Sequence, residues 1–196
     1  WALKNWPQLK EAGEHLAVGT VESYLIFRLT GGLHVTDASN ASRTQLMRID
    51  GQHGWDDELC DLFGVPKNIL PEIVGCTQNV GETSAQLFGA PIPICGMAGD
   101  QQAATVGQGC LTKGQTKATF GTGAFILTAT EDQIPISTHR LLSTILVQDG
   151  DQRHYAMEGS VFAAGSLIKW LRDGLGLLSN AAESEGLALS IPDNGG

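Results

Sequence analysis

The stretch CGMAGDQQAATVGQG, residues 95–109, places a single carboxylate, Asp100, between an apolar run and a series of small and amide residues. Gly99 precedes it at the predicted end of a buried strand, and the residues that follow predict a helix. One interpretation is a helix cap, because Asp commonly accepts hydrogen bonds from the first free amides of a helix. The other is a catalytic base, because ligands bind at the carboxyl ends of strands in α/β sheets. Both interpretations stay open on these residues alone.

Length and charge exclude several classes of protein. The 196 residues are 42% hydrophobic, enough for one large domain or two small ones. The net charge of -9, without a cluster of Lys or Arg, would repel a phosphate backbone, so we expect no nucleic-acid partner. Gly, Pro or Thr interrupts every apolar run well before the roughly 20 residues that cross a bilayer, which predicts no transmembrane segment.

The cysteines indicate where in the cell the protein is located, and the chain ends indicate whether the sequence is part of a longer protein. Cys60, Cys76, Cys95 and Cys110 are spaced singly, so we interpret them as reduced, small hydrophobic residues of a cytoplasmic protein, with a disulfide as the alternative. The chain starts at Trp1 without a signal-peptide pattern and ends abruptly at IPDNGG. We therefore expect an internal piece of a longer protein.

The first half of the chain reads mainly as helices. Residues 1–17 predict two short helices separated at Pro7. Residues 19–32 predict a helix that ends at Gly31 and Gly32. A strand and a polar loop are expected over 33–50, and a helix over 55–64. The helix over 19–32 is expected to pack through one apolar face, formed by Val21, Leu25, Ile26 and Leu29.

From Pro91 onward the sequence pattern changes from helical spacing to short apolar runs. Short apolar runs bounded by glycine predict successive strands, the middle ones joined by hairpins. A helix then closes the chain, with Leu167, Trp170, Leu171 and Leu175 at helical spacing. We therefore expect two regions with a seam between roughly Pro91 and Gly114.

Two glycine-rich segments follow Asp100. FGTGAF, residues 120–125, is either a plain hairpin turn or a turn whose bare amides and threonine hydroxyl surround a phosphate oxygen. EGSVFAAGSLIKW, residues 158–170, either packs a helix closely on a sheet or lets a nucleotide lie against the chain. The sequence has neither a G-x-x-x-x-G-K-[ST] loop nor a G-x-G-x-x-G fingerprint, so a nucleotide would require another architecture.

Taken in order, these segments resemble one known family. GMAGDQQAATVGQG, KATFGTGAF and YAMEGSVFAAGSLIKWLRDGLGL follow one another as in the FGGY carbohydrate kinases, and residues 19–32 with HVTDASNASRT are most similar to members that act on glycerol. The resemblance implies an α/β, actin/hexokinase-like (ribonuclease H-like) two-domain kinase fold, incomplete at both ends. Residues 1–107 would belong to the N-terminal, substrate domain and residues 108–196 to the C-terminal, nucleotide domain.

The resemblance also implies roles for single residues. Asp100 would be the general base that takes the proton of the attacking hydroxyl, and would help to hold Mg²⁺ through water. The substrate would contact Asp100, Gln101, Phe125 and Trp1. The nucleotide would contact Gly121, Thr122, Gly123, Gly165 and Lys169.

The implied reaction is ATP-dependent phosphorylation of a polyol, with glycerol converted to glycerol 3-phosphate as the favoured case. The alternatives are a kinase of another sugar or polyol, and a non-catalytic sugar- or nucleotide-binding relative. A homo-oligomer is expected by family analogy alone. The family's N-terminal phosphate segment, its upstream Arg-Glu substrate contacts and its C-terminal adenosine motif do not occur here, so we expect little or no activity from this chain by itself.

Four positions depart from the pattern or leave alternatives open. Ala38 stands where the glycerol-specific members carry an aromatic substrate contact, which leaves the exact polyol open. Lys169 replaces a glutamine and either reaches a phosphate or lies at the surface. Trp1 packs in the core or contacts ligand, and Arg43 can pair with a carboxylate. No role follows for the five histidines, which form no cluster: His15, His34, His53, His139 and His154.

Overall fold

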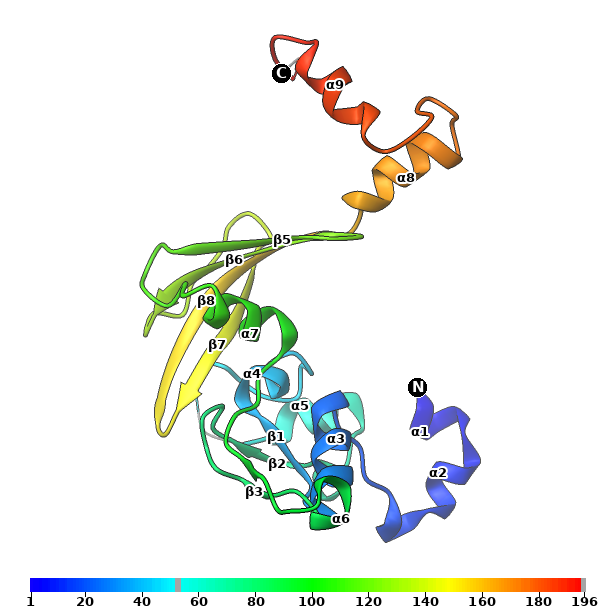
Figure 1. Ribbon diagram of the computed structural model, residues 1–196. Coiled ribbons are helices and arrows are strands. Elements are labelled where there is room, and N and C mark those ends of the chain that lie inside the picture. The colour runs from blue at the N-terminus through cyan, green and yellow to red at the C-terminus, as the bar shows by residue number, and fades with distance from the viewer. Residues whose placement is uncertain (52–53, 195–196) are drawn as a thin grey trace.

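An antiparallel sheet of four strands dominates the computed structural model, which describes residues 1–51 and 54–194 (Figure 1). The strand order is β5-β6-β8-β7. The bounds are Thr116–Phe120 for β5, Ala124–Glu131 for β6, Leu142–Asp149 for β7 and Gln152–Val161 for β8. Antiparallel pairing joins β5 to β6 and β7 to β8, which confirms the hairpins predicted from the glycine-bounded runs.

Apolar residues lie on both faces of β7 and β8. Leu146 and Ala156 are fully buried with Leu127 and Ala129 of β6. The neighbouring Ile145 and Tyr155 belong to a second cluster, with Ala38, Ala41 and Met47 from the first half of the chain. Successive side chains of a strand point to opposite faces, so burial on both faces accounts for a nearly continuous apolar run. The second cluster attaches the first half of the chain to the sheet.

A smaller unit built on two parallel strands lies below the sheet in Figure 1. Ile26, Val35, Val74 and Met97 form its apolar core. Its strands and helices are β1 (Val35–Asp37), β2 (Glu72–Val74), α3 (Val21–Thr30), α4 (Ala38–Ala41), α5 (Asp57–Phe63) and the 3-10 turn Lys67–Ile69. The strands β3 (Gly81–Glu82) and β4 (Pro93–Ile94) pair antiparallel, with α6 (Ala85–Phe88) between them in the chain.

Helix α7 (Asp100–Gly107) connects this unit to the sheet. Its Gln102, 3% exposed, donates from Nε2 to Thr144 Oγ1 of β7 at 3.2 Å. The helix contacts β5, β6 and β7. The carboxyl end of the 91–99 segment and the start of α7 are therefore held against the sheet.

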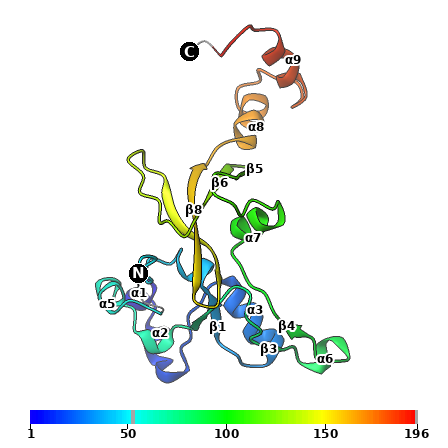
Figure 2. The same cartoon turned by 90° about the vertical axis from the view of Figure 1, so that its left-hand side faces the viewer.

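The terminal helices stand away from the rest of the chain. In Figure 1, α1 (Ala2–Asn5) and α2 (Pro7–Glu11) lie to one side, followed by the 3-10 turn Gly13–His15. Figures 1 and 2 both show α8 (Gly165–Asp173) and α9 (Glu183–Leu189) extending beyond the sheet. The two short N-terminal helices and α8 were predicted, and the structure confirms them, whereas α9 was not predicted.

The predicted packing of α3 is only partly confirmed, and α8 is largely exposed. In α3, Val21 is 77% exposed and Leu25 51% exposed, whereas Ser23 and Ile26 are buried. Ile26 packs in the apolar core, and a polar contact holds the start of the helix, because Thr36 Oγ1 of β1 donates to Glu22 Oε1 at 2.6 Å. In α8, Trp170 is 52% exposed and the helix buries no residue at all. Helical spacing of apolar residues is present in both helices, but it does not reveal what covers the face.

The predicted ends of α3 and α5 are confirmed, whereas the polar loop over 33–50 is only partly so. Gly31 and Gly64 follow these helices in the left-handed region, with φ of 81° and 64°, which favours glycine. The expected loop begins instead with helix α4. Asp37 caps this helix, since its carboxylate accepts the Ser39 amide at 2.8 Å.

All four cysteines are free, and they differ in burial. Cys60 and Cys76 are buried, whereas Cys95 is exposed. Burial and the nearby Asp37 raise the pKa of the Cys76 thiol to about 11.

Of the five histidines, His53 lies outside the described residues. Every helix in the described part of the chain is too short or too polar to cross a membrane.

Candidate active site

Asp100 is the first helical residue of α7, not its cap. Gly99 occupies the N-cap position with φ of -58° and ψ of 150°. The Asp100 carboxylate still accepts the Gln101 amide, at 2.8 Å from Oδ1, and remains exposed to solvent. The cap interpretation is therefore wrong in its position, although the carboxylate does take up one free amide of the helix.

A pocket of about 250 Å³ opens beside this carboxylate. It joins three residues predicted for the site, Asp100, Gln101 and Phe125. Arg43, Gln102 and Glu158 complete its lining. A carboxylate, an amide and an aromatic ring in one small concavity can orient a polar molecule and accept a proton from it.

Gly99 lies close to the Gln102 side chain where the chain enters α7. A Cβ added to Gly99 would lie 2.5 Å from Gln102 Oε1. The Gly99 amide donates to Ser39 Oγ at 2.9 Å, and the same hydroxyl donates to the buried Asp37 carboxylate. The polar residues of α4 thus fix the backbone that presents Asp100.

Ala38, where an aromatic substrate contact was expected from the family pattern, is fully buried. It packs with Ala41, Ile145 and Tyr155 under the sheet. It does not line the pocket beside Asp100. In this structure the side chain at position 38 therefore serves packing, and the aromatic lining of the pocket comes from Phe125.

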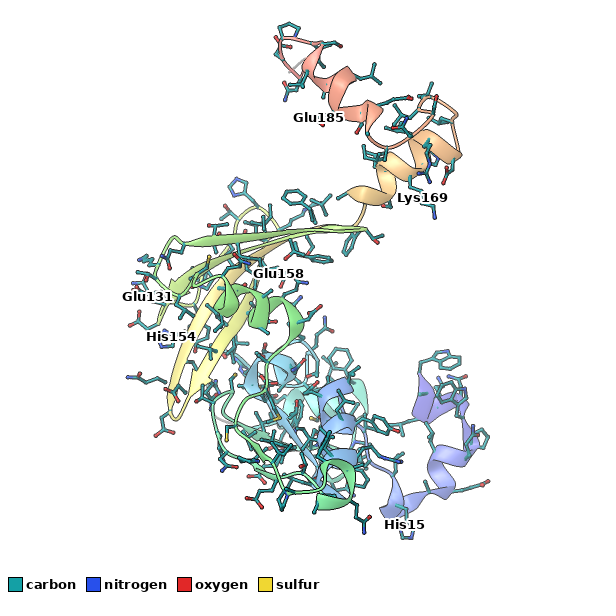
Figure 3. The ribbon with its side chains drawn as sticks, in the orientation of Figure 1. His15, Glu131, His154, Glu158, Lys169 and Glu185 are labelled. Atoms are coloured by element: carbon teal, nitrogen blue, oxygen red, sulfur yellow. The ribbon has the colours of Figure 1, made fainter. Side chains whose placement is uncertain are left out.

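Arg43 pairs with a carboxylate, as the sequence suggested, and its partner is Glu158 on β8. The Arg43 Nη1 to Glu158 Oε2 distance is 3.0 Å, and Nη2 donates to Oε1 at 3.2 Å. Glu158 is 4% exposed and also accepts from Ser160 Oγ at 3.0 Å. Figure 3 shows Glu158 on the part of the sheet beside α7. A two-point contact of this kind holds the guanidinium in a fixed orientation at the pocket wall.

The FGTGAF segment forms the tight turn between β5 and β6, which confirms the hairpin interpretation. Gly121 N donates to Gly123 O at 2.8 Å across the turn. The start of α8 docks on it, with Ala164 N bonded to Thr122 O at 2.8 Å and Gly165 N to Gly121 O at 2.9 Å. The Thr122 side chain is exposed. Close helix-to-sheet packing at Gly165 is likewise confirmed, and phosphate contacts by these residues stay a prediction.

Gly165 tests how tightly this turn and α8 are joined. A Cβ at position 165 would lie 2.6 Å from Gly121 O, so we expect Gly165→Ala to destabilise the full-length protein by about 1 to 3 kcal/mol through overpacking. Gly186→Ala in α9 is the matched control, because a Cβ there meets nothing within 4 Å. Urea unfolding of both variants measures the difference. Equal urea midpoints for the two variants would show that the turn accommodates the added Cβ without loss of stability.

Trp1 and Lys169 lie outside the pocket. The Trp1 side chain is 82% exposed and meets Trp6 edge-on, with ring centroids 5.7 Å apart. Its predicted alternative, packing in the core, is wrong in this structure. Lys169 is exposed on α8, away from Glu158 and the sheet (Figure 3). Ligand contacts by these two residues stay predictions.

Two models of one family match nearly the whole chain. The N-terminal domain model of the FGGY family of carbohydrate kinases matches residues 1–107, and the C-terminal domain model matches residues 116–192. The chain belongs to the FGGY family of carbohydrate kinases. The resemblance inferred from residues 95–109 and the two later glycine segments is confirmed.

Relatives within the FGGY family are considerably longer than this chain. A glycerol kinase of Xanthobacter autotrophicus is 56% identical over 179 residues, which is 91% of this chain and 36% of the relative. A glycerol kinase of Methylobacterium nodulans is 53% identical over 192 residues, which is 96% of this chain and 38% of the relative. The chain thus spans well under half the length of these relatives.

A solved FGGY structure shares the architecture. The crystal structure of Plasmodium falciparum glycerol kinase with ADP matches with a TM-score of 0.88 at 35% identity, over 98% of this chain and 39% of that one. The predicted actin/hexokinase-like α/β fold is confirmed.

Beside the pocket, a buried residue that no sequence motif indicated contacts Gln101. Lys117 of β5 is 5% exposed, and its Nζ donates to Gln101 Oε1 at 2.7 Å. Burial lowers the pKa of Lys117, and the carboxylates of Asp100 and Glu158 partly oppose this effect. Its signal in the sequence is weak, because a lysine between threonine and alanine in a strand is ordinarily exposed.

Proposed function

We propose that the full-length protein containing this chain transfers a phosphoryl group from ATP to glycerol, with Asp100 as general base. The observation that carries the proposal is the pocket shared by Asp100, Gln101 and Phe125. Its volume of about 250 Å³ lies below the roughly 300 to 1,000 Å³ typical of pockets for drug-sized ligands, which suits a small polyol. The identity of 56% to a glycerol kinase supports glycerol as the substrate.

Each pocket residue has a different role in binding or activating the polyol. Asp100 is exposed at the start of a helix, so a substrate hydroxyl can reach its carboxylate and lose a proton to it as the oxygen attacks phosphorus. Gln101 offers its side-chain amide to a hydroxyl of the same molecule. Phe125 covers the carbon skeleton and keeps water from the reacting oxygen. We assign Trp1 to the substrate side only as a further prediction from family likeness.

The phosphates of the nucleotide bind at the turn between β5 and β6. Gly121 and Gly123 keep side chains away from this turn, and the exposed Thr122 hydroxyl can donate to a phosphate oxygen. We propose that Gly165 and Lys169 of α8 line the nucleotide from the other side. We likewise propose the division of the chain at residues 107 and 108 into substrate and nucleotide domains.

The residues present fit Mg²⁺ of the kind that retains much of its water. Such ions are usually held by one or two carboxylates together with substrate phosphates. Asp100 supplies one exposed carboxylate, and the described part of the chain has no group of three His, Cys, Asp or Glu side chains placed to hold a metal. When bound, Mg²⁺ would neutralise phosphate charge during transfer. A cytoplasmic location and a homo-oligomeric state stay predictions.

The test is ADP release by the full-length protein with Mg·ATP and a panel of polyols. We expect selective turnover of glycerol over dihydroxyacetone, erythritol and pentoses, because Phe125 supplies the aromatic wall even though position 38 is Ala. Turnover with another polyol alone would correct the substrate. Binding without turnover of any polyol would favour the alternative, a non-catalytic relative of the same fold.

A further inference from the structure

Lys117 is a buried cation beside the proposed base. It is 5% exposed, whereas its strand neighbours Thr116, Ala118 and Phe120 are exposed. Removing an ammonium group from water is unfavourable unless polar partners replace the lost hydration. The partners of Lys117 therefore indicate what the buried charge does.

Both hydrogen-bond partners of Lys117 are neutral. Its Nζ donates to Gln101 Oε1 at 2.7 Å and to Thr119 Oγ1 at 2.9 Å. Thr119 belongs to the same strand, so the contact with Gln101 is the one that crosses from β5 to α7. A hydrogen bond from a charged donor is stronger than one between neutral groups, and this one fixes the end of the Gln101 side chain.

The chemistry of an ammonium group dictates which way the Gln101 amide points. Lysine donates hydrogen bonds and accepts none, so the amide oxygen must face Lys117. The amide nitrogen then faces the opposite way, where Nε2 lies 3.4 Å from Asp100 Oδ2. Only N–H donors of Gln101 are therefore available at the pocket.

This polarity determines how a substrate hydroxyl binds. A hydroxyl that meets the Gln101 N–H groups must accept with its oxygen, which leaves its own hydrogen free to point at Asp100. With the amide reversed, the hydroxyl would donate its hydrogen to the Gln101 oxygen and would not present it to the base. The orientation of one amide thus favours or blocks proton transfer.

We propose that Lys117 is a positioning residue, which holds the Gln101 amide so that a substrate hydroxyl directs its proton to Asp100. The assignment rests on the proposed function, since it names a hydroxyl as the group bound. It predicts that Lys117 acts through Gln101 and on the polyol side of the reaction only.

Lys117→Met tests this role, because methionine has a similar length and no donor. We expect kcat/KM for the polyol to fall about 10- to 100-fold, in line with the loss of a hydrogen bond to a charged group, while KM for ATP stays unchanged. Lys117→Arg, which keeps the charge and the donors, should retain more activity. Lys113→Met is the matched control, because Lys113 is exposed and its Nζ also donates to a glutamine, Gln133, at 2.8 Å. The control should match the unmodified protein.

A double-mutant cycle with Gln101→Leu separates positioning from a general structural effect. If Lys117 acts through Gln101, Lys117→Met changes kcat/KM less than about 3-fold once Gln101 is absent. Equal losses in both backgrounds, or a parallel rise in KM for ATP, would overturn the assignment.

Thermal unfolding tests the Lys117–Gln101 contact independently of enzyme activity. The four proteins compared are the unmodified protein, Lys117→Met, Gln101→Leu and the double variant. We expect Lys117→Met to lower Tm in the unmodified background and to lower it less in the Gln101→Leu background. Additive losses of Tm would contradict the Lys117–Gln101 contact whatever the protein phosphorylates. Absence of polyol turnover in the unmodified protein would instead contradict the proposed function, and the coupled Tm values would still decide whether the contact exists.

Discussion

We expect replacement of Asp100 by Asn to lower kcat of the full-length protein by about 10²- to 10⁴-fold, the range that a general base contributes, while polyol binding is largely retained. Asparagine keeps the shape of the side chain and an oxygen that can accept the Gln101 amide, which the carboxylate accepts at 2.8 Å. What it lacks is the ability to take a proton from a hydroxyl. The loss should therefore appear in kcat, measured as ADP release at saturating glycerol.

Asp57→Asn is the matched control for this prediction. Asp57 is also the exposed first residue of a helix, α5, so both substitutions remove a negative charge from a helix N-terminus. Asp57 pairs with Lys67 at 2.9 Å and lies outside the Asp100 pocket. Its loss should leave turnover unchanged. An Asp100→Asn protein with normal turnover would remove Asp100 from the role of base.

Local chemistry in the sequence predicted much of the secondary structure. Pro7 separated two helices, Gly31 and Gly64 ended two others, and glycine-bounded runs gave the hairpins, because each of these features acts through neighbouring backbone. Packing was less predictable. Helical periodicity finds an apolar face but not its partner, and so the exposure of Leu25 and Trp170 could not be foreseen.

In the candidate site, too, residues adjacent in the chain could be predicted, whereas residues brought together by the fold could not. Asp100 and Gln101 are adjacent in the chain and were assigned together from one motif. Lys117 and Glu158 reach that motif only because β5 and β8 lie in one sheet that α7 contacts. No spacing in the sequence encodes this approach. The buried charges that surround the proposed base therefore required the fold.

Asp37→Ala is the substitution with the largest expected effect on stability. The Asp37 carboxylate is fully buried and accepts from Asn40 Nδ2 at 2.6 Å, from the Ser39 amide at 2.8 Å and from Cys76 Sγ at 3.3 Å, besides the Ser39 hydroxyl. Its removal loses a helix cap and leaves several buried donors without an acceptor. We expect a loss of about 3 kcal/mol or more in the free energy of unfolding, measured by urea denaturation of the full-length protein.

Asp56→Ala isolates the capping part of this effect. Asp56 caps α5 through a single bond from the Leu59 amide at 2.9 Å, so its loss should cost about 1 kcal/mol. Asp37 is also connected to the candidate active site, because the Ser39 hydroxyl that donates to it accepts the Gly99 amide beside Asp100. Asp37→Asn, which keeps one acceptor oxygen, should therefore lower kcat as well as stability. Equal destabilisation by Asp37→Ala and Asp56→Ala would show that the buried network adds nothing to the cap.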